Sequence, residues 1–302
     1  MTSSRVISAP ASHGGRLLPS VIEHFIELPL TRLHYVKCGD GPPLIMVPAT
    51  ISRVDNWLPL LQYMGKYFTT YFFELPGHGE STPFAGRFTT HKVAETVRDL
   101  ADALGHENIS LMGFSFGGLL TMRSLALLGD RVDKVVLHAP ALSYRSMKFS
   151  RPRRMMVKLV IKAMRQRPIR NGFNRLIRNK SVRPVLARLI KSMGKIEENV
   201  DAEKILTIIT PTTCEVMANQ FDEVLNLDLP APTERYSQDC FFSHSINDPM
   251  VDYETALSIV REQFSKVHTH QLITPYHQPP KPPTYEEIEG WLNPLLGRLT
   301  HK

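Results

Sequence analysis

The sequence has no uninterrupted apolar run that approaches the roughly 20 residues required by a membrane-spanning helix. Residues 1–20 also lack the apolar stretch of a secretory signal peptide and are mostly polar or small. We therefore predict a flexible N-terminal arm at 1–20 and a cytoplasmic location. The chain is 42% hydrophobic, and its 302 residues suffice for one large α/β domain with an insertion.

Cysteine is scarce in this chain. Cys38, Cys214 and Cys240 are odd in number and far apart, which favours neither a disulfide framework nor a metal site. We interpret them as reduced, mostly buried thiols. His268 and His270 are the closest histidine pair, and two histidines alone are a weak metal signal. No metal ion is predicted.

Acidic residues are missing from one long segment. Residues 141–195 contain 17 lysines and arginines and no aspartate or glutamate, whereas the rest of the chain has 19 basic and 29 acidic residues. The formal net charge of +7 therefore comes from this basic segment. Any effect of positive charge on binding should be sought there.

Strand-like and helix-like segments alternate along residues 21–140 and 231–302. The expected strands are 21–28, 32–38, 43–48, 68–75, 109–113, 132–138, one within 238–246, and 267–274, and the expected helices are 54–64, 91–104, 115–128, 252–264 and 285–296. This alternation predicts βαβ crossovers and a mostly parallel sheet with helices on both faces. Residues 141–230 break the rhythm and predict a helical, initially basic insertion.

The pentapeptide Gly113-Phe114-Ser115-Phe116-Gly117 lies between an expected strand and an expected helix. In this setting a Gly-x-Ser-x-Gly motif places the serine on a sharp turn with its hydroxyl exposed. The glycines let the strand and helix backbones approach closely. Ser115 is therefore the candidate nucleophile, in preference to a serine in an ordinary glycine-rich turn.

A serine hydroxyl needs a base to take its proton and an anion to orient that base. In a sheet of this kind the acid follows a late strand and the histidine follows the last strand, so the chain order is Ser, Asp, His. Asp248 follows the apolar run at 240–242, and His277 follows the expected strand at 267–274. We predict a Ser115-Asp248-His277 triad.

Other residues compete for the acid and base roles. Asp252 and Glu254 fall where the next helix should begin, so we interpret them as its N-cap and as a first-turn partner of its dipole. His268 and His270 fall within the last expected strand, and His244 precedes the acid turn. These positions favour the acid and the base named above.

Backbone N–H groups must also stabilise the oxyanion of a tetrahedral intermediate, and losing one such donor costs about 3 to 4 kcal/mol. The first predicted donor is the N–H of Phe116, directly after the candidate nucleophile. The second lies in the loop after the strand at 43–48, where we predict Thr50. Pro48 cannot serve, because it has no N–H to donate.

Together these residues resemble the α/β-hydrolase family over nearly the whole chain outside residues 1–20 and the insertion. The segment LPGHGES at 75–81 is similar to the family's turn after its fourth strand, and NDPMV at 247–251 is similar to its acid turn. The resemblance implies an eight-stranded, mostly parallel sheet and a Ser115-Asp248-His277 triad. It also implies a helical lid at 141–230 and neither a metal nor a cofactor.

Two positions depart from the family pattern. Many members have His-Gly before the oxyanion residue, where this chain has Pro48-Ala49, and many have glycine before the catalytic histidine, where it has Tyr276. Tyr276 crowds the site and is predicted to touch substrate. Phe114 beside the nucleophile and Ile51 in the oxyanion loop are predicted to do the same.

We predict a serine hydrolase that cleaves a carboxylic ester or thioester with an apolar acyl group through an acyl-enzyme; its partner is then a small-molecule ester or a lipid. One alternative is hydrolysis of a carbon-carbon bond in a diketone-like substrate by the same triad. Another is a ligand-binding or membrane-associated protein of the same fold with little turnover. The departure at Pro48-Ala49 supports this last alternative.

The basic segment carries cations at helical spacing. Arg154, Lys158, Lys162 and Arg165 form one stripe on an expected helix with an otherwise apolar surface. One interpretation is a lid whose apolar faces cover the site and whose charges are solvated. Another is peripheral docking on an anionic membrane, where each base adds about 1 kcal/mol. Nucleic-acid binding is not expected, because no recognition motif accompanies the charges.

Overall fold

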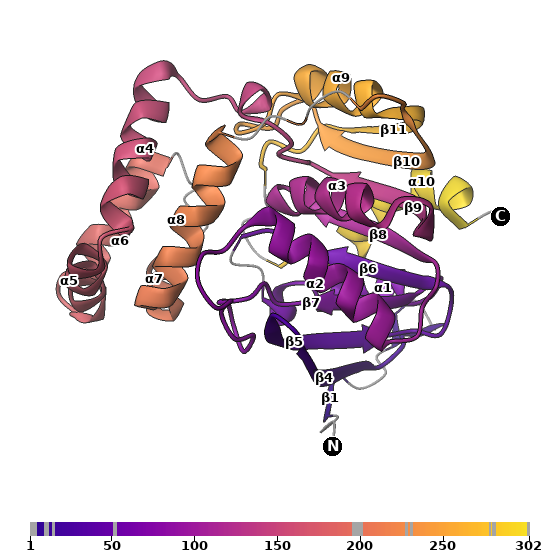
Figure 1. Cartoon of the computed structure of the whole chain (residues 1–302), viewed down its shortest axis with the longest axis horizontal. Helices are drawn as coiled ribbons and strands as arrows, with labels where there is room; N and C mark the ends of the chain where they lie inside the picture. The colour runs from indigo at the N-terminus through magenta and orange to yellow at the C-terminus, as the bar shows by residue number, and fades with distance from the viewer. Residues whose placement is uncertain are drawn as a thin grey trace.

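The computed structural model describes residues 5–8, 12–13, 16–50, 53–194, 202–226, 229, 232–277, 279 and 282–300. Figure 1 shows a central twisted sheet with helices packed against it and a separate group of helices, α4 to α8, standing beside it. This group forms the connection between β9 and β10. An α/β core is therefore interrupted by a helical insertion.

Nine strands form the main sheet within the described residues, in the order β1-β4-β5-β7-β6-β8-β9-β10-β11. Strands β6 to β11 are parallel to one another. Strands β1, β4 and β5 are each antiparallel to their neighbours. The predicted mostly parallel α/β sheet is confirmed, with one strand more than expected. The bounds are β1 Arg5–Ser8, β4 Val21–Leu28, β5 Thr31–Cys38, β6 Pro43–Val47, β7 Thr69–Phe73, β8 Ile109–Phe114, β9 Val132–His138, β10 Tyr236–Ser245 and β11 Phe264–Leu272.

The additional strand lies in the segment that was expected to be a flexible arm. β1 pairs antiparallel with β4, with Arg5 opposite Glu23. The short strands β2 (Ser12–His13) and β3 (Arg16–Leu17) pair with each other. Without β1, β4 would be an open sheet edge whose unpaired N–H and C=O groups accept any extended segment. This pairing uses main-chain hydrogen bonds, so the polar composition of residues 1–20 did not reveal it.

Successive side chains of each central strand enter two cores, one on each face of the sheet. In β6, Leu44 and Met46 belong to the core shared with α1 (Leu58–Met64) and α10 (Tyr285–Thr300). Ile45 and Val47 belong to the opposite core, which contains residues of α2 (Thr90–Ala103), α3 (Phe116–Leu128) and α9 (Tyr253–Gln263). Helices on both faces explain why the central strands β7 and β8 are buried along their whole length.

The parallel strands β8 to β11 end at one edge of the sheet. Phe114 at the end of β8 is paired with His138 at the end of β9, and His138 is paired with Ser243 in β10. Ser115 directly follows β8, Asp248 comes three residues after β10, and His277 comes five residues after β11. Side chains that follow the carboxyl ends of parallel strands converge at this edge.

The described residues of the insertion form five helices, which we call the cap. They are α4 Arg151–Met164, α5 Arg167–Arg178, α6 Arg183–Gly194, α7 Ala202–Ile208 and α8 Pro211–Asn226, and short 3-10 turns occur at Val54–Asn56, Gly129–Arg131 and Tyr144–Ser146. Figure 1 shows α8 between α4 and the sheet. Gln220 of α8 lies 3.0 Å from Nε2 of buried His78, in the turn after β7. The cap is thus joined to the core by a buried polar contact.

Because His78 is buried at this contact, we expect it to make stability depend on pH. Burial lowers the pKa of His78 from 6.5 to about 4, and the hydrogen bond with Gln220 opposes this only in part. In the unfolded chain, His78 therefore becomes protonated as the pH falls below 6.5. In the folded chain it becomes protonated only at about pH 4. This stabilisation is complete above pH 6.5 and is lost as the pH falls towards 4.

The test is urea unfolding at pH 7 and at pH 4.5 for the wild type and His78→Gln, which keeps a polar group but does not titrate. The wild type should lose about 2 to 3 kcal/mol more free energy of unfolding between the two pH values than the variant. Other buried histidines contribute equally to both proteins. Equal losses would contradict the prediction.

Candidate active site

Ser115 occupies a strained turn between β8 and α3. Its backbone angles are φ 48° and ψ −119°, a region that residues other than glycine rarely adopt and that costs roughly 1 to 3 kcal/mol. The Ser115 side chain does not cap α3. Its Oγ lies instead 2.7 Å from Nε2 of His277. The turn therefore presents the hydroxyl to the imidazole.

Main-chain hydrogen bonds hold this turn in place. The N–H of Ser115 donates to the carbonyl of His138 over 3.1 Å. The Ser115 carbonyl accepts from the N–H groups of Gly118 and Ala141, each over 2.9 Å. Ala139, in the loop that leads from β9 into the cap, also has a positive φ of 45°. The strained serine is thus supported by the neighbouring strand and the start of the insertion.

The two glycines of the pentapeptide permit close backbone approach. A Cβ on Gly113 would lie 2.3 Å from Oγ1 of Thr121, and a Cβ on Gly117 would lie 2.3 Å from the carbonyl oxygen of Val47. Both distances are far shorter than van der Waals contact. Strands β6 and β8 can therefore approach the first turn of α3 this closely only with glycine at these positions.

We expect Gly117→Ala to destabilise the protein by about 1 to 3 kcal/mol, because the methyl group would overlap the backbone of β6. Gly172→Ala is the matched control: Gly172 lies within α5, and a Cβ there meets nothing within 4 Å. That control should stabilise the protein by up to about 1 kcal/mol through helix propensity. Urea unfolding of both variants measures the difference. A neutral Gly117→Ala would show that β6 and α3 separate at no cost.

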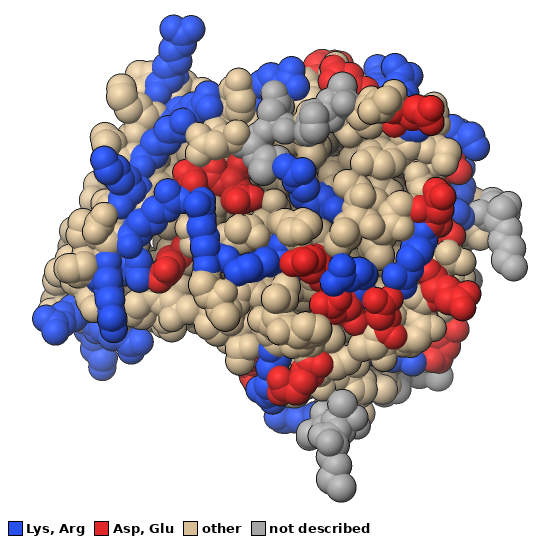
Figure 2. Space-filling model, viewed as in Figure 1, with Lys and Arg blue, Asp and Glu red and all other residues tan. Residues whose placement is uncertain are grey.

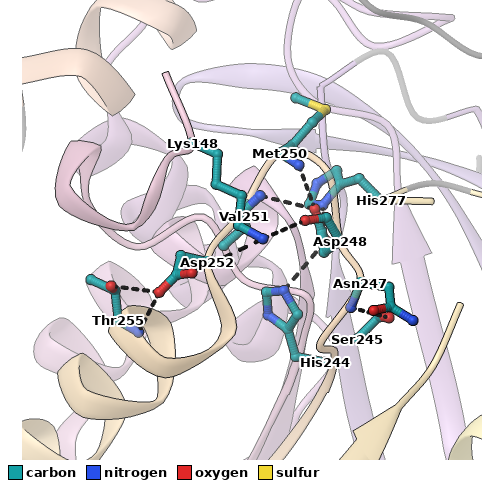
Figure 3. A network of polar contacts seen from close by, with 10 residues as sticks. All are labelled: Lys148, His244, Ser245, Asn247, Asp248, Met250, Val251, Asp252, Thr255 and His277. Carbon is teal, nitrogen blue, oxygen red and sulfur yellow. Dashed lines mark hydrogen bonds and ion pairs between the residues drawn. The ribbon is translucent and has the colours of Figure 1, made fainter. Parts of the chain in front are cut away.

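Asp248 is held by the loop after β10 and points at His277 (Figure 3). Its Oδ2 accepts a hydrogen bond from Nδ1 of His277 over 2.6 Å. Its Oδ1 accepts from the N–H groups of Met250 at 2.7 Å and Val251 at 2.9 Å. Lys148, from the start of the insertion, donates to the Asp248 carbonyl over 2.8 Å. Both carboxylate oxygens therefore have fixed donors.

Two imidazoles face the same carboxylate oxygen. Nε2 of His244, which is fully buried in β10, lies 3.3 Å from Oδ2 of Asp248 (Figure 3). Burial alone would raise the pKa of Asp248, but the contacts with His244, His277 and the N–H of Val251 hold it well below its usual range. These contacts therefore favour the charged form of Asp248, which accepts the hydrogen bond from Nδ1 of His277.

The competing acid has a different role in the structure. The side chain of Asp252 caps α9 and accepts hydrogen bonds from the N–H of Thr255 at 3.0 Å and its hydroxyl at 2.7 Å. These hydrogen bonds lower the pKa of Asp252. Among the competing histidines, His268 is half-buried in the edge strand β11 and contacts Asp239 of β10 at 2.8 Å.

Aromatic side chains surround a small cavity beside Ser115. The ring centroid of Phe114 lies 4.6 Å from that of Trp57 and 5.0 Å from that of His138, which in turn stacks on Trp291 at 5.8 Å. Burial, and then the charges of His244 and His277, lowers the pKa of His138 to about 3. His138 is therefore neutral and acts as part of an apolar wall. The cavity is lined by Trp57, Phe114, Ser115, His138, Ala139, His277, Pro279 and Trp291.

The predicted oxyanion donors lie on two adjacent segments. Phe116 is the first residue of α3, where N–H groups lack partners within the helix. The close approach of Gly117 to the carbonyls of Val47 and Pro48 sets the start of the β6 loop beside this helix end. Thr50 follows in that loop and is half-buried.

The remaining predicted substrate contacts have different outcomes. Phe114 lines the small cavity beside Ser115. Tyr276 is half-buried and directly precedes His277. Ile51 lies outside the described residues.

A second cavity, of about 430 Å³, lies between the core and the cap. The turn after β7 forms one side of it, and the connection from α7 to α8 forms the other. Arg53, which follows the β6 loop, also contributes. The cavity is lined by Arg53, Gly77, His78, Gly79, Glu80, Ser81, Pro83, Ile208, Thr210, Thr212 and Thr213.

Residues 42–278 match the model of a family described as alpha/beta hydrolase fold, a match that covers well over half of the chain. The chain belongs to the alpha/beta hydrolase fold family. The resemblance that the sequence motifs predicted is thereby confirmed, and so is the fold class.

Individual alpha/beta hydrolases are similar to this chain only in part. It is 27% identical to (E)-2-((N-methylformamido)methylene)succinate hydrolase of Acinetobacter baylyi over 34% of this chain and 40% of that protein. It is 28% identical to a carboxylesterase of Bacillus subtilis over 40% of this chain and 42% of that protein. The matched segments thus span about two fifths of these relatives.

Among solved structures, an esterase from Thermogutta terrifontis superposes with a TM-score of 0.67 and 18% identity, covering 92% of this chain and 99% of that one. At this identity the likeness shows the alpha/beta hydrolase fold alone.

Several residues at the site of this alpha/beta hydrolase were missed by sequence reasoning. His138 ends the strand next to the nucleophile strand, a position that could have marked it. His244 was considered only as a base, although it precedes Asp248 by four residues. Nothing in the sequence pointed to Trp57 or Trp291.

The three cysteines of this alpha/beta hydrolase are free and buried, as predicted. Within the described ranges, no group of three or more histidine, cysteine or acidic side chains is placed to hold a metal ion.

Proposed function

We propose that the protein is a serine hydrolase that cleaves a carboxylic ester or thioester with an apolar acyl group. The observation that carries this proposal is the unbroken series of contacts from the Asp248 carboxylate through His277 to the Ser115 hydroxyl, at 2.6 and 2.7 Å. This order of groups matches what nucleophilic catalysis by serine requires. The esterases among the similar proteins support the class of bond.

In the proposed reaction, Ser115 Oγ attacks the carbonyl carbon while Nε2 of His277 takes the hydroxyl proton. The imidazolium then gives that proton to the departing alcohol or thiol, and an acyl-enzyme remains. Water attacks the acyl carbon and loses a proton to His277, which returns it to Ser115 as the acid departs. Asp248 keeps the Nδ1 proton in place and stabilises the imidazolium.

The oxyanion of each tetrahedral intermediate would accept hydrogen bonds from the N–H groups of Phe116 and Thr50. The start of α3 supports the first donor, because the positive end of the helix dipole faces the site. The short distance between Gly117 and the end of β6 supports the second, because it brings the two loops together.

The walls of the cavity beside Ser115 support an apolar acyl group. Trp57, Phe114 and Trp291 stand beside Ser115, and neutral His138 adds no charge to them. The larger cavity between core and cap has a separate lining, in which threonines and Arg53 supply polar groups.

The experiment combines a fluorophosphonate label with a substrate panel. The panel contains p-nitrophenyl esters of increasing acyl length, the matching acyl-CoA thioesters and a diketone-like substrate. We expect one label per chain and ester or thioester cleavage whose kcat/KM rises with acyl length. Cleavage of the diketone alone would replace the proposal with carbon-carbon bond hydrolysis. Ligand binding without any label or turnover would replace it with a binding protein of this fold.

A further inference from the structure

Exposed apolar side chains are concentrated on three helices of the cap. Helices α4, α5 and α6 have only 14, 12 and 12 residues. Yet they carry seven of the twelve large hydrophobic side chains that are exposed in the described part of the chain. We call these seven, together with the cations between them, the outer cap surface. The seven are Met155, Leu159, Val160, Ile169, Leu176, Val185 and Leu189.

Cations alternate with these apolar side chains along the helix surface. On α4, Met155, Lys158, Leu159 and Lys162 are all exposed and lie at positions i, i+3, i+4 and i+7 of one stripe. On α6, Val185, Arg188 and Leu189 repeat the first three positions. On each of these helices, exposed apolar side chains and exposed cations therefore lie next to one another along one face.

Whether a cation of the cap has an acidic partner depends on the direction its side chain faces. Three of those that face α7 and α8 pair with acids there: Arg165 with Asp222, Arg170 with Glu215 and Arg183 with Glu203. The outward cations Lys158, Lys162 and Arg188 have no acidic partner among the residues that the structure describes. Figure 2 shows lysine and arginine side chains running along the side formed by α4 and α5, with tan surface between them. The outer cap surface therefore carries an unbalanced positive charge.

We propose that the outer cap surface docks on an anionic lipid bilayer. A bilayer offers anionic headgroups and, a few ångströms deeper, an apolar layer, which matches long basic side chains flanking exposed methionine, leucine and valine. A nucleic acid would satisfy the cations but would leave Met155, Leu159 and Val185 without apolar partners. The docking is peripheral: within the described helices, none is long and apolar enough to cross a membrane. It is independent of the proposed hydrolysis.

The test is vesicle flotation of the full-length protein. Vesicles of phosphatidylcholine alone are compared with vesicles that also contain phosphatidylserine, and the protein should float only with the anionic ones. Since each cation near the surface contributes about fivefold to affinity, Lys158→Glu/Lys162→Glu should weaken binding at least about 25-fold. The control Arg235→Glu/Lys266→Glu changes the net charge equally at exposed positions of the core and should bind like the wild type.

A second pair of variants tests the apolar contribution. Leu159→Asp should weaken binding about tenfold or more, whereas Leu127→Asp, at an exposed apolar position of α3, should not. Thermal unfolding shows that each variant is folded. Equal binding to neutral and anionic vesicles, an equal defect in the core controls, or binding to duplex DNA without binding to vesicles would each overturn the proposal.

Discussion

Ser115→Ala should abolish ester and thioester hydrolysis, with a decrease in kcat on the order of 10⁴- to 10⁶-fold. Alanine removes the hydroxyl that lies 2.7 Å from Nε2 of His277, so neither an attacking oxygen nor a proton for the base remains. It also relieves none of the backbone strain, because φ at this position stays positive. The variant should fold, bind substrate and take up no fluorophosphonate.

Ser124→Ala is the matched control for this variant. Ser124 lies in α3, the helix that follows Ser115, is fully buried, and donates its hydroxyl to the carbonyl of Leu120 over 2.9 Å. Its loss should cost about 1 kcal/mol of stability and leave the label and kcat near wild-type values. Full turnover by Ser115→Ala would show that another group attacks the substrate. Loss of turnover in both variants would point to damage to α3.

The second large effect is expected for Asp248→Asn, with kcat reduced about 10⁴-fold and KM little changed. An amide NH₂ at the Oδ1 position would face the N–H donors of Met250 and Val251. The NH₂ therefore turns towards His277 and donates to Nδ1. That tautomer carries its proton on Nε2 and cannot accept the proton of the serine.

Asp252→Asn provides the control and separates the two candidate acids. Asp252 is the N-cap of α9, and asparagine is an equally good N-cap, so neither stability nor kcat should change appreciably. Steady-state kinetics of both variants on one ester is the measurement. A large loss of kcat in Asp252→Asn with activity preserved in Asp248→Asn would reverse the assignment of the acid.

Chain order was sufficient to select three side chains that the structure brings together. Ser115, Asp248 and His277 each follow a strand that its apolar run predicts, and parallel strands deliver their following residues to one edge. The role of the two glycines of the pentapeptide was also predictable from the sequence, because only glycine permits the approach of α3 to β6 and β8. Asp252 was readable as a helix cap, because capping is a local property of sequence.

Contacts between elements that are far apart in the chain could not be predicted from the sequence. The position of His244 against Asp248 depends on how the loop after β10 folds back on its own strand. Trp57 and Trp291 reach the serine from α1's side of the sheet and from the last helix, which only packing brings together. The edge strand β1 has only four residues, too few to show a periodic pattern, and its main-chain pairing with β4 depends on the fold.

The basic segment at 141–195 shows what composition can determine and what requires the tertiary structure. Its composition alone determined where the positive charge lies, because charge is counted along the chain. Only the tertiary structure decided which cations are neutralised by α7 and α8 and which face outward beside exposed apolar side chains. The sequence by itself thus determined the fold class and the order of the acid, base and serine, which depend on local periodicity and strand ends. The walls of the site and the outer cap surface depend on packing between helices far apart in the chain. Local sequence patterns do not predict that packing.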